Sequence, residues 1–174
     1  MQLSTAIKLI EGGILKSNSS QRWADLGAGE GLFTQALGSI LPPKSLVLAI
    51  DQNVNSVKSI GWNFKSITLQ TQAADFTSMN WGEKFHGIIM ANALHYVLDQ
   101  VDFLAKLQAK ILPSGRLIIV EYERRKPNTW VPYPIDFMKL KETAEGVGFS
   151  SITKLGEVPS IYDGVAIYSA VLTL

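Results

Sequence analysis

The chain contains no cysteine among its 174 residues. This absence excludes disulfides, cysteine-ligated zinc and iron–sulfur clusters, and it also excludes a thiolate nucleophile. No metal site is predicted. The formal net charge is only +1, so the chain lacks the basic excess that draws a protein toward nucleic acid or an anionic membrane.

Long apolar runs are also missing. The first 18 residues have no charged leader followed by an unbroken apolar core, and no later run approaches the length that spans a bilayer. We therefore expect a cytoplasmic protein without a membrane partner, as a monomer or a homodimer. The length and the 47% hydrophobic content suit a single domain over residues 1–174, with residues 1–20 as an N-terminal helical extension. Within that extension we expect a helix over residues 4–15, capped by Ser4.

Residues 23–37 (WADLGAGEGLFTQAL) predict a strand, a glycine turn and a helix. Alternate glycines allow a ligand to approach the main chain closely, and the following helix offers free amide hydrogens. The spacing is G-x-G-x-G, whereas the dinucleotide fingerprint is G-x-G-x-x-G. Asp25, which precedes the glycines, would repel a phosphate but can accept hydrogen bonds from an ammonium group. Spacing and acid together disfavour a pyrophosphate ligand.

At these residues the sequence resembles the first motif of class I S-adenosylmethionine-dependent methyltransferases, which reads roughly D-x-G-x-G-x-G. The resemblance implies that this segment cradles the methionine moiety and the adjacent ribose. The alternative is a tight strand-to-helix connection with no ligand. The cofactor-binding residues expected here are Asp25, Gly27, Ala28, Gly29 and Gly31.

Two further acids follow predicted strands. Asp51 ends the apolar run 45–50 and is expected, with Gln52, to bind the ribose, because one carboxylate can accept from both hydroxyls. Its alternative role is to cap a helix over residues 54–62. A third strand is expected over residues 66–70, and the family resemblance places Asp75 at the adenine amino group and Phe76 against the ring. A surface turn acid is the alternative for Asp75.

The fourth predicted strand, residues 85–90, leads into ANALHY. This segment is similar to the family's fourth-strand region and departs from the [DN]-P-P-[YF] pattern of enzymes that methylate base amines or glutamine side chains. Ala91 and Asn92 are expected to contact the cofactor. His95, with Tyr96, is expected to border the acceptor and to serve as the base, although His95 packing locally at a helix start is an equal alternative.

The second half of the chain predicts a helix over residues 99–112, with Val101, Leu104, Leu107 and Ile111 along its apolar stripe, and a strand over residues 115–122. A helix over residues 135–147 and an antiparallel pair, 150–158 and 161–174, follow. Residues 123–134, rich in proline and basic residues, predict a semi-rigid loop at the ligand edge. The substrate-pocket candidates are Tyr122, Trp130 and Tyr133.

The resemblance covers nearly the full chain. It implies an α/β fold with a Rossmann-like, seven-stranded, mostly parallel sheet, an antiparallel C-terminal hairpin and helices on both faces. It also implies S-adenosylmethionine as cofactor, S-adenosylhomocysteine as product, and methyl transfer to an oxygen or nitrogen acceptor. A small molecule is favoured because few residues remain for a cap, while the basic and aromatic loop leaves RNA or protein open. The alternatives are a non-catalytic cofactor-binding module and, disfavoured by the glycine spacing, a nicotinamide-dependent oxidoreductase.

Overall fold

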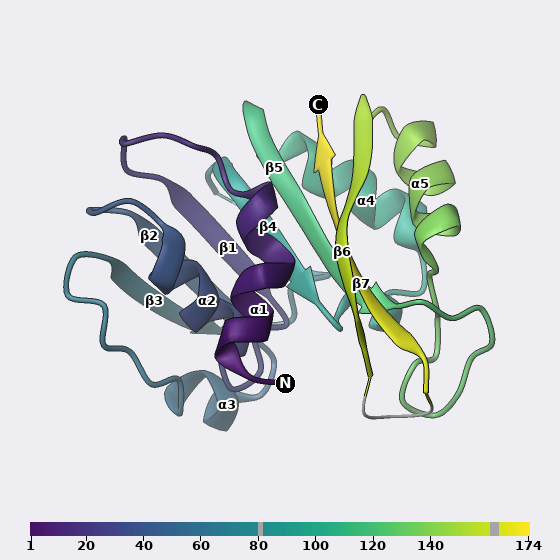
Figure 1. Cartoon of the computed structure of the whole chain (residues 1–174), viewed down its shortest axis with the longest axis horizontal. Helices are drawn as coiled ribbons and strands as arrows, with labels where there is room; N and C mark the ends of the chain where they lie inside the picture. The colour runs from purple at the N-terminus through teal and green to yellow at the C-terminus, as the bar shows by residue number, and fades with distance from the viewer. Residues whose placement is uncertain (80–81, 161–163) are drawn as a thin grey trace.

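The computed structural model describes residues 1–79, 82–160 and 164–174. Its centre is a seven-stranded sheet in the order β3-β2-β1-β4-β5-β7-β6 (Figure 1). Strands β1 to β5 run parallel, whereas β7 is antiparallel to both of its neighbours, β5 and β6. The predicted Rossmann-like sheet with an antiparallel C-terminal pair is therefore confirmed. The strands are β1 (Arg22–Leu26), β2 (Leu46–Asp51), β3 (Thr68–Ala73), β4 (Phe85–Ala91), β5 (Ile111–Tyr122), β6 (Ser151–Pro159) and β7 (Ala166–Thr173).

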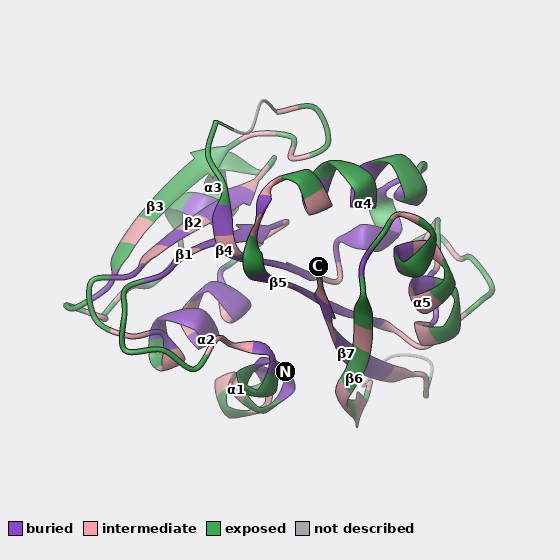
Figure 2. Cartoon of the chain, turned by 90° about the horizontal axis from the view of Figure 1, so that it is seen from above, coloured by how far each residue is buried: buried purple, intermediate pink, exposed green. Residues whose placement is uncertain are grey.

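Helices cover both faces of this sheet, as Figure 2 shows from above. Along the central strands, successive side chains alternate between two apolar clusters. In β4, for example, Ile88 and Met90 join one cluster, and Ile89 joins the other. The first cluster includes α4 (Gln100–Ala109) and α5 (Phe137–Gly146), and the second includes α1 (Leu3–Ile10) and α2 (Leu32–Ile40). Apolar runs covered on both sides are the pattern expected of a parallel sheet.

Several helix boundaries differ from the predicted ones. The first helix begins at Leu3 and ends at Ile10, after which Glu11–Gly13 forms a 3-10 turn, so Ser4 lies inside the helix and does not cap it. A Cβ on Gly13 would lie 2.8 Å from Ile118, and this close passage over the sheet explains why the regular helix stops there. The helix α3 (Val54–Lys58) is shorter than 54–62 because Ile60 turns inward and packs over Gly31.

The helix predicted over residues 99–112 is α4, which ends at Ala109. Lys110 is its C-cap, and the next two residues belong to β5. Ile111 pairs with Phe85 and starts β5, which is longer than the predicted strand 115–122. Val101 is 56% exposed, so the apolar stripe runs through Phe103, Leu104 and Leu107 instead. The third strand, β3, begins two residues after the start of the predicted strand 66–70 and extends to Ala73, because it pairs with β2 as far as Asp51. The last helix, α5, is capped by Asp136, whose side chain accepts from the Lys139 amide.

Part of the predicted C-terminal strand 161–174 falls on residues 161–163, which lie outside the described ranges. The remainder contains β7, whose register with β6 runs from Ser151 opposite Thr173 to Pro159 opposite Ala166. In the part of the chain that the structure describes, none of the helices has the length and apolar character that crossing a bilayer requires.

Candidate functional site

The glycine turn after β1 is tied to the neighbouring strand by two hydrogen bonds. The amides of Gly27 and Ala28 both donate to the carbonyl of Ile50, at 2.8 and 2.9 Å. Gly27 has φ +75°, and a Cβ there would lie 2.6 Å from the Cβ of Ala93, so no larger residue fits without a shift. The backbone of the turn therefore packs directly on the segment that follows β4.

Asp51 joins the glycine turn to the end of β2. Its Oδ2 accepts from the amide of Gly29 at 2.9 Å, and its Oδ1 accepts from the amide of Asn53 at 2.8 Å. A Cβ on Gly29 would meet no described atom within 4 Å, so this part of the turn is open to a ligand. The cap of α3 is Asn53, whose Oδ1 accepts from two amides of the helix. The alternative role of Asp51 as that cap is therefore wrong.

A cavity of about 450 Å³ opens at this edge of the sheet. It gathers residues from the ends of four consecutive segments of the parallel sheet, as expected of a Rossmann-like fold. Six of the predicted cofactor residues line it together with Tyr96, and two further residues, Thr77 and Ala93, were not predicted. The lining is Gly27, Asp51, Gln52, Asp75, Phe76, Thr77, Asn92, Ala93 and Tyr96.

Asp75 presents a charged carboxylate to this cavity. Its Oδ1 accepts from both the hydroxyl (2.7 Å) and the amide (2.8 Å) of Thr77, and these hydrogen bonds hold the pKa of Asp75 below its usual value. Phe76 lies beside it and packs on Phe103, with ring centroids 5.7 Å apart. The Asp75 carboxylate, which can accept hydrogen bonds, and the aromatic ring of Phe76 thus lie side by side.

Five predicted cofactor residues do not line this cavity. Asp25 is 1% exposed and its Oδ2 accepts from the Thr34 hydroxyl at 2.6 Å, so it is enclosed below the turn. Burial, with a smaller contribution from the nearby charge of Asp51, raises the pKa of Asp25 to about 7. Position 31 requires a glycine, because its backbone is left-handed and a Cβ there would lie 2.6 Å from the side chain of Ile60. Ala28, Gly29 and Ala91 are also outside the lining, and their contacts with a ligand, like that of Asp25, stay predictions.

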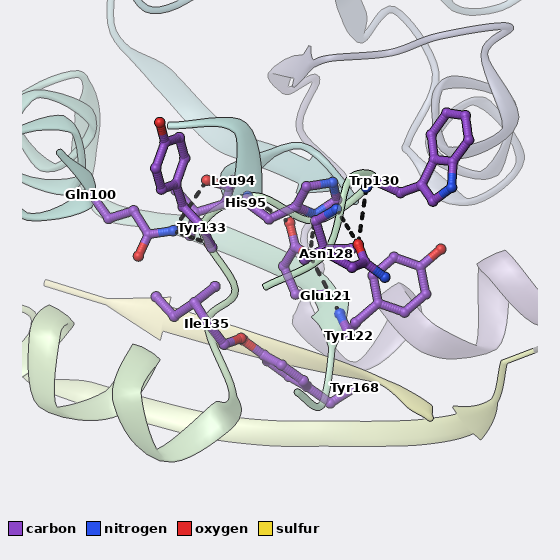
Figure 3. Close-up of polar contacts among 11 residues, drawn as sticks. Leu94, His95, Gln100, Glu121, Tyr122, Asn128, Trp130, Tyr133, Ile135 and Tyr168 are labelled. Atoms are coloured by element: carbon purple, nitrogen blue, oxygen red, sulfur yellow. Dashed lines mark hydrogen bonds and ion pairs between the residues drawn. The ribbon is translucent and has the colours of Figure 1, made fainter. Parts of the chain in front are cut away.

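His95 lies in a short 3-10 turn (η2, Leu94–Tyr96) after β4 and is buried against β5. Its Nδ1 lies 2.7 Å from Oε2 of Glu121, and its backbone amide donates to Oε1 of the same carboxylate at 3.2 Å. Both side chains are at most 2% exposed. The amide of Tyr122 also donates to Oε2. The Glu121 carboxylate therefore has three hydrogen-bond partners, and these contacts fix the position of the imidazole (Figure 3).

A second cavity, also of about 450 Å³, lies beside the imidazole. Of the predicted substrate-pocket residues, Tyr122 and Trp130 contribute to it. The ring of Tyr133 points away from Tyr122 and Glu121 in Figure 3, and Tyr133 is not in the described lining. Tyr133 instead anchors the loop through its backbone, since its amide donates to the His95 carbonyl and its carbonyl accepts from Gln100. The lining is Asn92, His95, Tyr96, Tyr122, Arg124, Asn128, Trp130, Val131 and Val165.

The predicted loop 123–134 closes one side of the second cavity and is held by its own hydrogen bonds. Oδ1 of Asn128 accepts from the amides of Trp130 (2.9 Å) and Val131 (2.7 Å). An ion pair joins Arg125 to Asp136 at the start of α5. Val131 is buried, whereas Trp130 is 75% exposed at the rim. The loop is thus an ordered segment that lines the cavity and exposes the Trp130 ring at its rim.

The two cavities share Asn92 and Tyr96. Asn92 directly follows β4 in a left-handed conformation (φ +51°), and its Oδ1 is buried without a hydrogen-bond partner among the described residues. Tyr96 is 57% exposed, and its ring lies on that of His95, with centroids 4.3 Å apart. A ligand in one cavity would therefore meet a ligand in the other at these two residues.

A larger and more open cavity, of about 1000 Å³, lies elsewhere. Its lining comes from residues 11–18 and from the connection between α2 and β2, including Ile40, Pro42 and Pro43. This connection leads into the amino-terminal end of β2, whereas both smaller cavities lie at the carboxyl ends of the strands. Volume alone would select this groove, but the polar groups suited to bind a ligand converge on the smaller pair.

Sequence reasoning missed Glu121, which the structure pairs with His95 beside the second cavity. A signal was present, because Glu121 interrupts the apolar run LIIVEY of a strand covered on both faces, and a buried carboxylate requires a partner. Asn128 gave no comparable signal. His86, the other histidine, accepts a hydrogen bond from the Arg22 amide through Nδ1 at 3.0 Å and so has a structural partner.

Comparison with known proteins identifies a family. A family model described as a methyltransferase domain matches residues 24–119. Comparison with curated protein sequences finds no match.

Solved structures share the fold at low identity. The YcgJ protein from Bacillus subtilis superposes with a TM-score of 0.73 at 12% identity, covering 98% of each chain. A TehB-like methyltransferase from Corynebacterium glutamicum gives a TM-score of 0.62 at 18% identity, covering 97% of this chain and 86% of the other. The N-terminal domain of EvdMO1 with S-adenosylhomocysteine bound gives 0.68 at 16% identity, covering 98% and 80%.

Proposed function

The chain belongs to the family of methyltransferase domains, whose cofactor is S-adenosylmethionine, and we propose that it transfers a methyl group to an oxygen or nitrogen atom of a small molecule. One observation carries this proposal. The cavity lined by Asp51 and Asp75 adjoins a second cavity that contains a buried histidine, and both share the wall formed by Asn92 and Tyr96. A donor site and an acceptor site must meet in this way for a methyl group to pass between them.

The residues of the first cavity fit the cofactor. The Asp51 carboxylate would accept from the ribose hydroxyls, while the charged Asp75 would accept from the adenine amino group and Phe76 would face the ring. The open space over Gly29 leaves room for a ligand against the main chain. When bound, the cofactor supplies a methyl group that its sulfonium already activates. The protein's task is therefore to bind, orient and exclude water.

His95, oriented by Glu121, would accept the proton that an oxygen or nitrogen acceptor loses. With Nδ1–H donating to Glu121, the imidazole keeps Nε2 unprotonated, so Nε2 is the atom available as a base. The bound cofactor would supply the activated methyl group, and the proton that the acceptor loses on methylation would pass to Nε2 of His95. A positioned base contributes about 10²–10⁴-fold to such a reaction.

The structural neighbours act on different acceptors, so the fold alone does not identify the acceptor here. The N-terminal domain of EvdMO1 is known with D-fucose present, a Chlamydomonas reinhardtii neighbour methylates arsenic(III), and CurJ is a carbon methyltransferase. The second cavity of this chain holds aromatic rings from Tyr96, Tyr122 and Trp130. With a volume of about 450 Å³, it suits a small molecule with an aromatic or other apolar part.

A transfer assay with labelled S-adenosylmethionine tests the proposal. Purified protein would be incubated with metabolite fractions and, separately, with RNA and protein fractions of a cell extract. We expect label in the metabolite fraction, and label only in RNA or protein would overturn the small-molecule assignment. Calorimetric titration with S-adenosylhomocysteine should give micromolar affinity. Binding without transfer to any fraction would favour the non-catalytic module, and binding of NADH in its place would favour an oxidoreductase.

A further inference from the structure

The side chain of Asn92, at the wall between the two cavities, has an oxygen without a hydrogen-bond donor among the described residues. Its Oδ1 is buried, and no described residue donates to it. Buried polar atoms in folded proteins nearly always have a hydrogen-bond partner, so an exception calls for an explanation. Since Asn92 lines both cavities, a ligand is the natural partner.

The backbone at Asn92 is fixed by a hydrogen bond and by an uncommon conformation. The Asn92 amide donates to the Val120 carbonyl at 2.8 Å, which extends the pairing of β4 with β5 by one residue. At this point the chain turns with φ +51°, a conformation that is uncommon for residues other than glycine and that asparagine tolerates better than most. Asn92 thus places an amide group where a glycine would satisfy the backbone equally well.

The chemistry of the orphan atom defines its partner. A carboxamide oxygen only accepts, so the ligand group must carry an O–H or N–H. We infer that Oδ1 of Asn92 accepts a hydrogen bond from a hydroxyl or amine of the methyl acceptor, and that Asn92 thereby selects acceptors carrying such a hydrogen and positions them beside His95. The inference rests on the proposed function and gives Asn92 a different partner from the cofactor contact that the sequence predicts.

The test compares small probes that carry an O–H or N–H hydrogen with counterparts in which methyl replaces it. Wild-type protein saturated with S-adenosylhomocysteine would be titrated by ligand-observed NMR with phenol and with anisole, and then with aniline and with N,N-dimethylaniline. We expect phenol and aniline to bind about tenfold or more tightly than their methylated counterparts, because the latter leave the buried oxygen without a partner. In Asn92→Gly, the difference should shrink to about threefold or less.

Glycine is the informative substitution because it removes the amide and suits the left-handed backbone, so the variant is expected to fold. Lys44→Gly is the matched control. Lys44 is the other described non-glycine residue with positive φ (+66°) and lies outside both cavities, so its replacement should leave the discrimination unchanged.

The outcomes separate the inference from the proposed function. Failure of the wild type to bind S-adenosylhomocysteine would overturn both. Normal cofactor binding with equal affinity for phenol and anisole, or with no binding of either probe at millimolar concentration, would overturn the role of Asn92 alone. The same holds if Asn92→Gly keeps the discrimination, or if it weakens S-adenosylhomocysteine binding more than about tenfold, which would assign Oδ1 to the cofactor.

Discussion

Oε2 of Glu121 lies 2.7 Å from Nδ1 of His95, and the other oxygen of the same carboxylate accepts from the His95 backbone amide. The two residues are 26 positions apart in the chain and come from adjacent segments, η2 and β5. One carboxylate therefore fixes both the position of the turn and the orientation of its imidazole. Glu121 positions the imidazole in this arrangement, and His95 is the residue of the pair that lines the second cavity.

Replacing His95 by glutamine should lower kcat by about 10²–10⁴-fold, because glutamine lacks the basic nitrogen. Turnover would be measured with labelled methyl donor once an acceptor fraction is identified. S-adenosylhomocysteine affinity should stay within about threefold of wild type. Unchanged turnover and an unchanged pH profile would remove His95 from the mechanism.

Glu121→Gln should lower kcat with little change in KM, since the acceptor does not touch Glu121 and only the tautomer and orientation of His95 are altered. About tenfold or more is expected, as for other residues that orient a catalytic histidine. A changed pH profile distinguishes this role from a purely structural one. A variant with reduced folding stability but wild-type kcat and pH profile would contradict it.

Asp51→Asn should weaken S-adenosylhomocysteine binding about tenfold or more, because it removes the carboxylate that we propose accepts hydrogen bonds from the ribose hydroxyls. Asn53→Ala is the matched control, since Asn53 caps α3 and does not line the cavity. It should reduce the free energy of unfolding by about 1 kcal/mol and leave cofactor affinity nearly unchanged. Calorimetric titration and urea unfolding give the two quantities. Equal loss of affinity in both variants would show that Asp51 acts only through the turn.

Asp25 should make stability depend on pH. Its pKa is about 7 in the folded protein and 3.8 for an ordinary aspartate, so the folded state binds more protons between these values and stability falls as pH rises through them. Asp25 contributes about 4 kcal/mol to the free energy of unfolding at low pH, and this contribution is lost by about pH 8. Asp25→Asn, which retains an oxygen for Thr34, should remove this slope. Urea unfolding across the range measures it, and an identical slope in both proteins would refute the assignment.

Gly87→Ala should destabilise the sheet. A Cβ there would lie 2.4 Å from the ring of Trp23, which is fully buried in the adjacent strand, so overpacking of about 1–3 kcal/mol or more is expected. Gly146→Ala, at the end of α5, is the control because a Cβ at that position would meet no described atom within 4 Å. It should be neutral or stabilising by up to about 1 kcal/mol. Equal unfolding midpoints for the two variants would contradict this packing argument.

The architecture could be predicted because it depends on patterns local in sequence. Continuous apolar runs mark strands covered on both faces, and the glycines after β1 mark a turn that only small residues allow. Asp51 and Asp75 could be placed in one cavity because parallel strands bring their carboxyl ends to the same edge. Helix ends were less predictable. Contacts with residues distant in sequence decide that Ile60 lies outside α3 and that Ile111 lies in β5 and not in α4.

The sequence by itself determined the individual strands and the glycine turn, since these follow from hydrophobic periodicity and turn chemistry, while its resemblance to class I methyltransferases implied the sheet topology and the cofactor edge. Only the tertiary structure decided which residues line the two cavities. It enclosed Asp25 beneath the turn and directed the Tyr133 ring away from the second cavity, while it paired His95 with Glu121 and left the Asn92 oxygen without a partner among the described residues. The physical reason is that burial and hydrogen-bond satisfaction depend on segments that pack together from different parts of the chain.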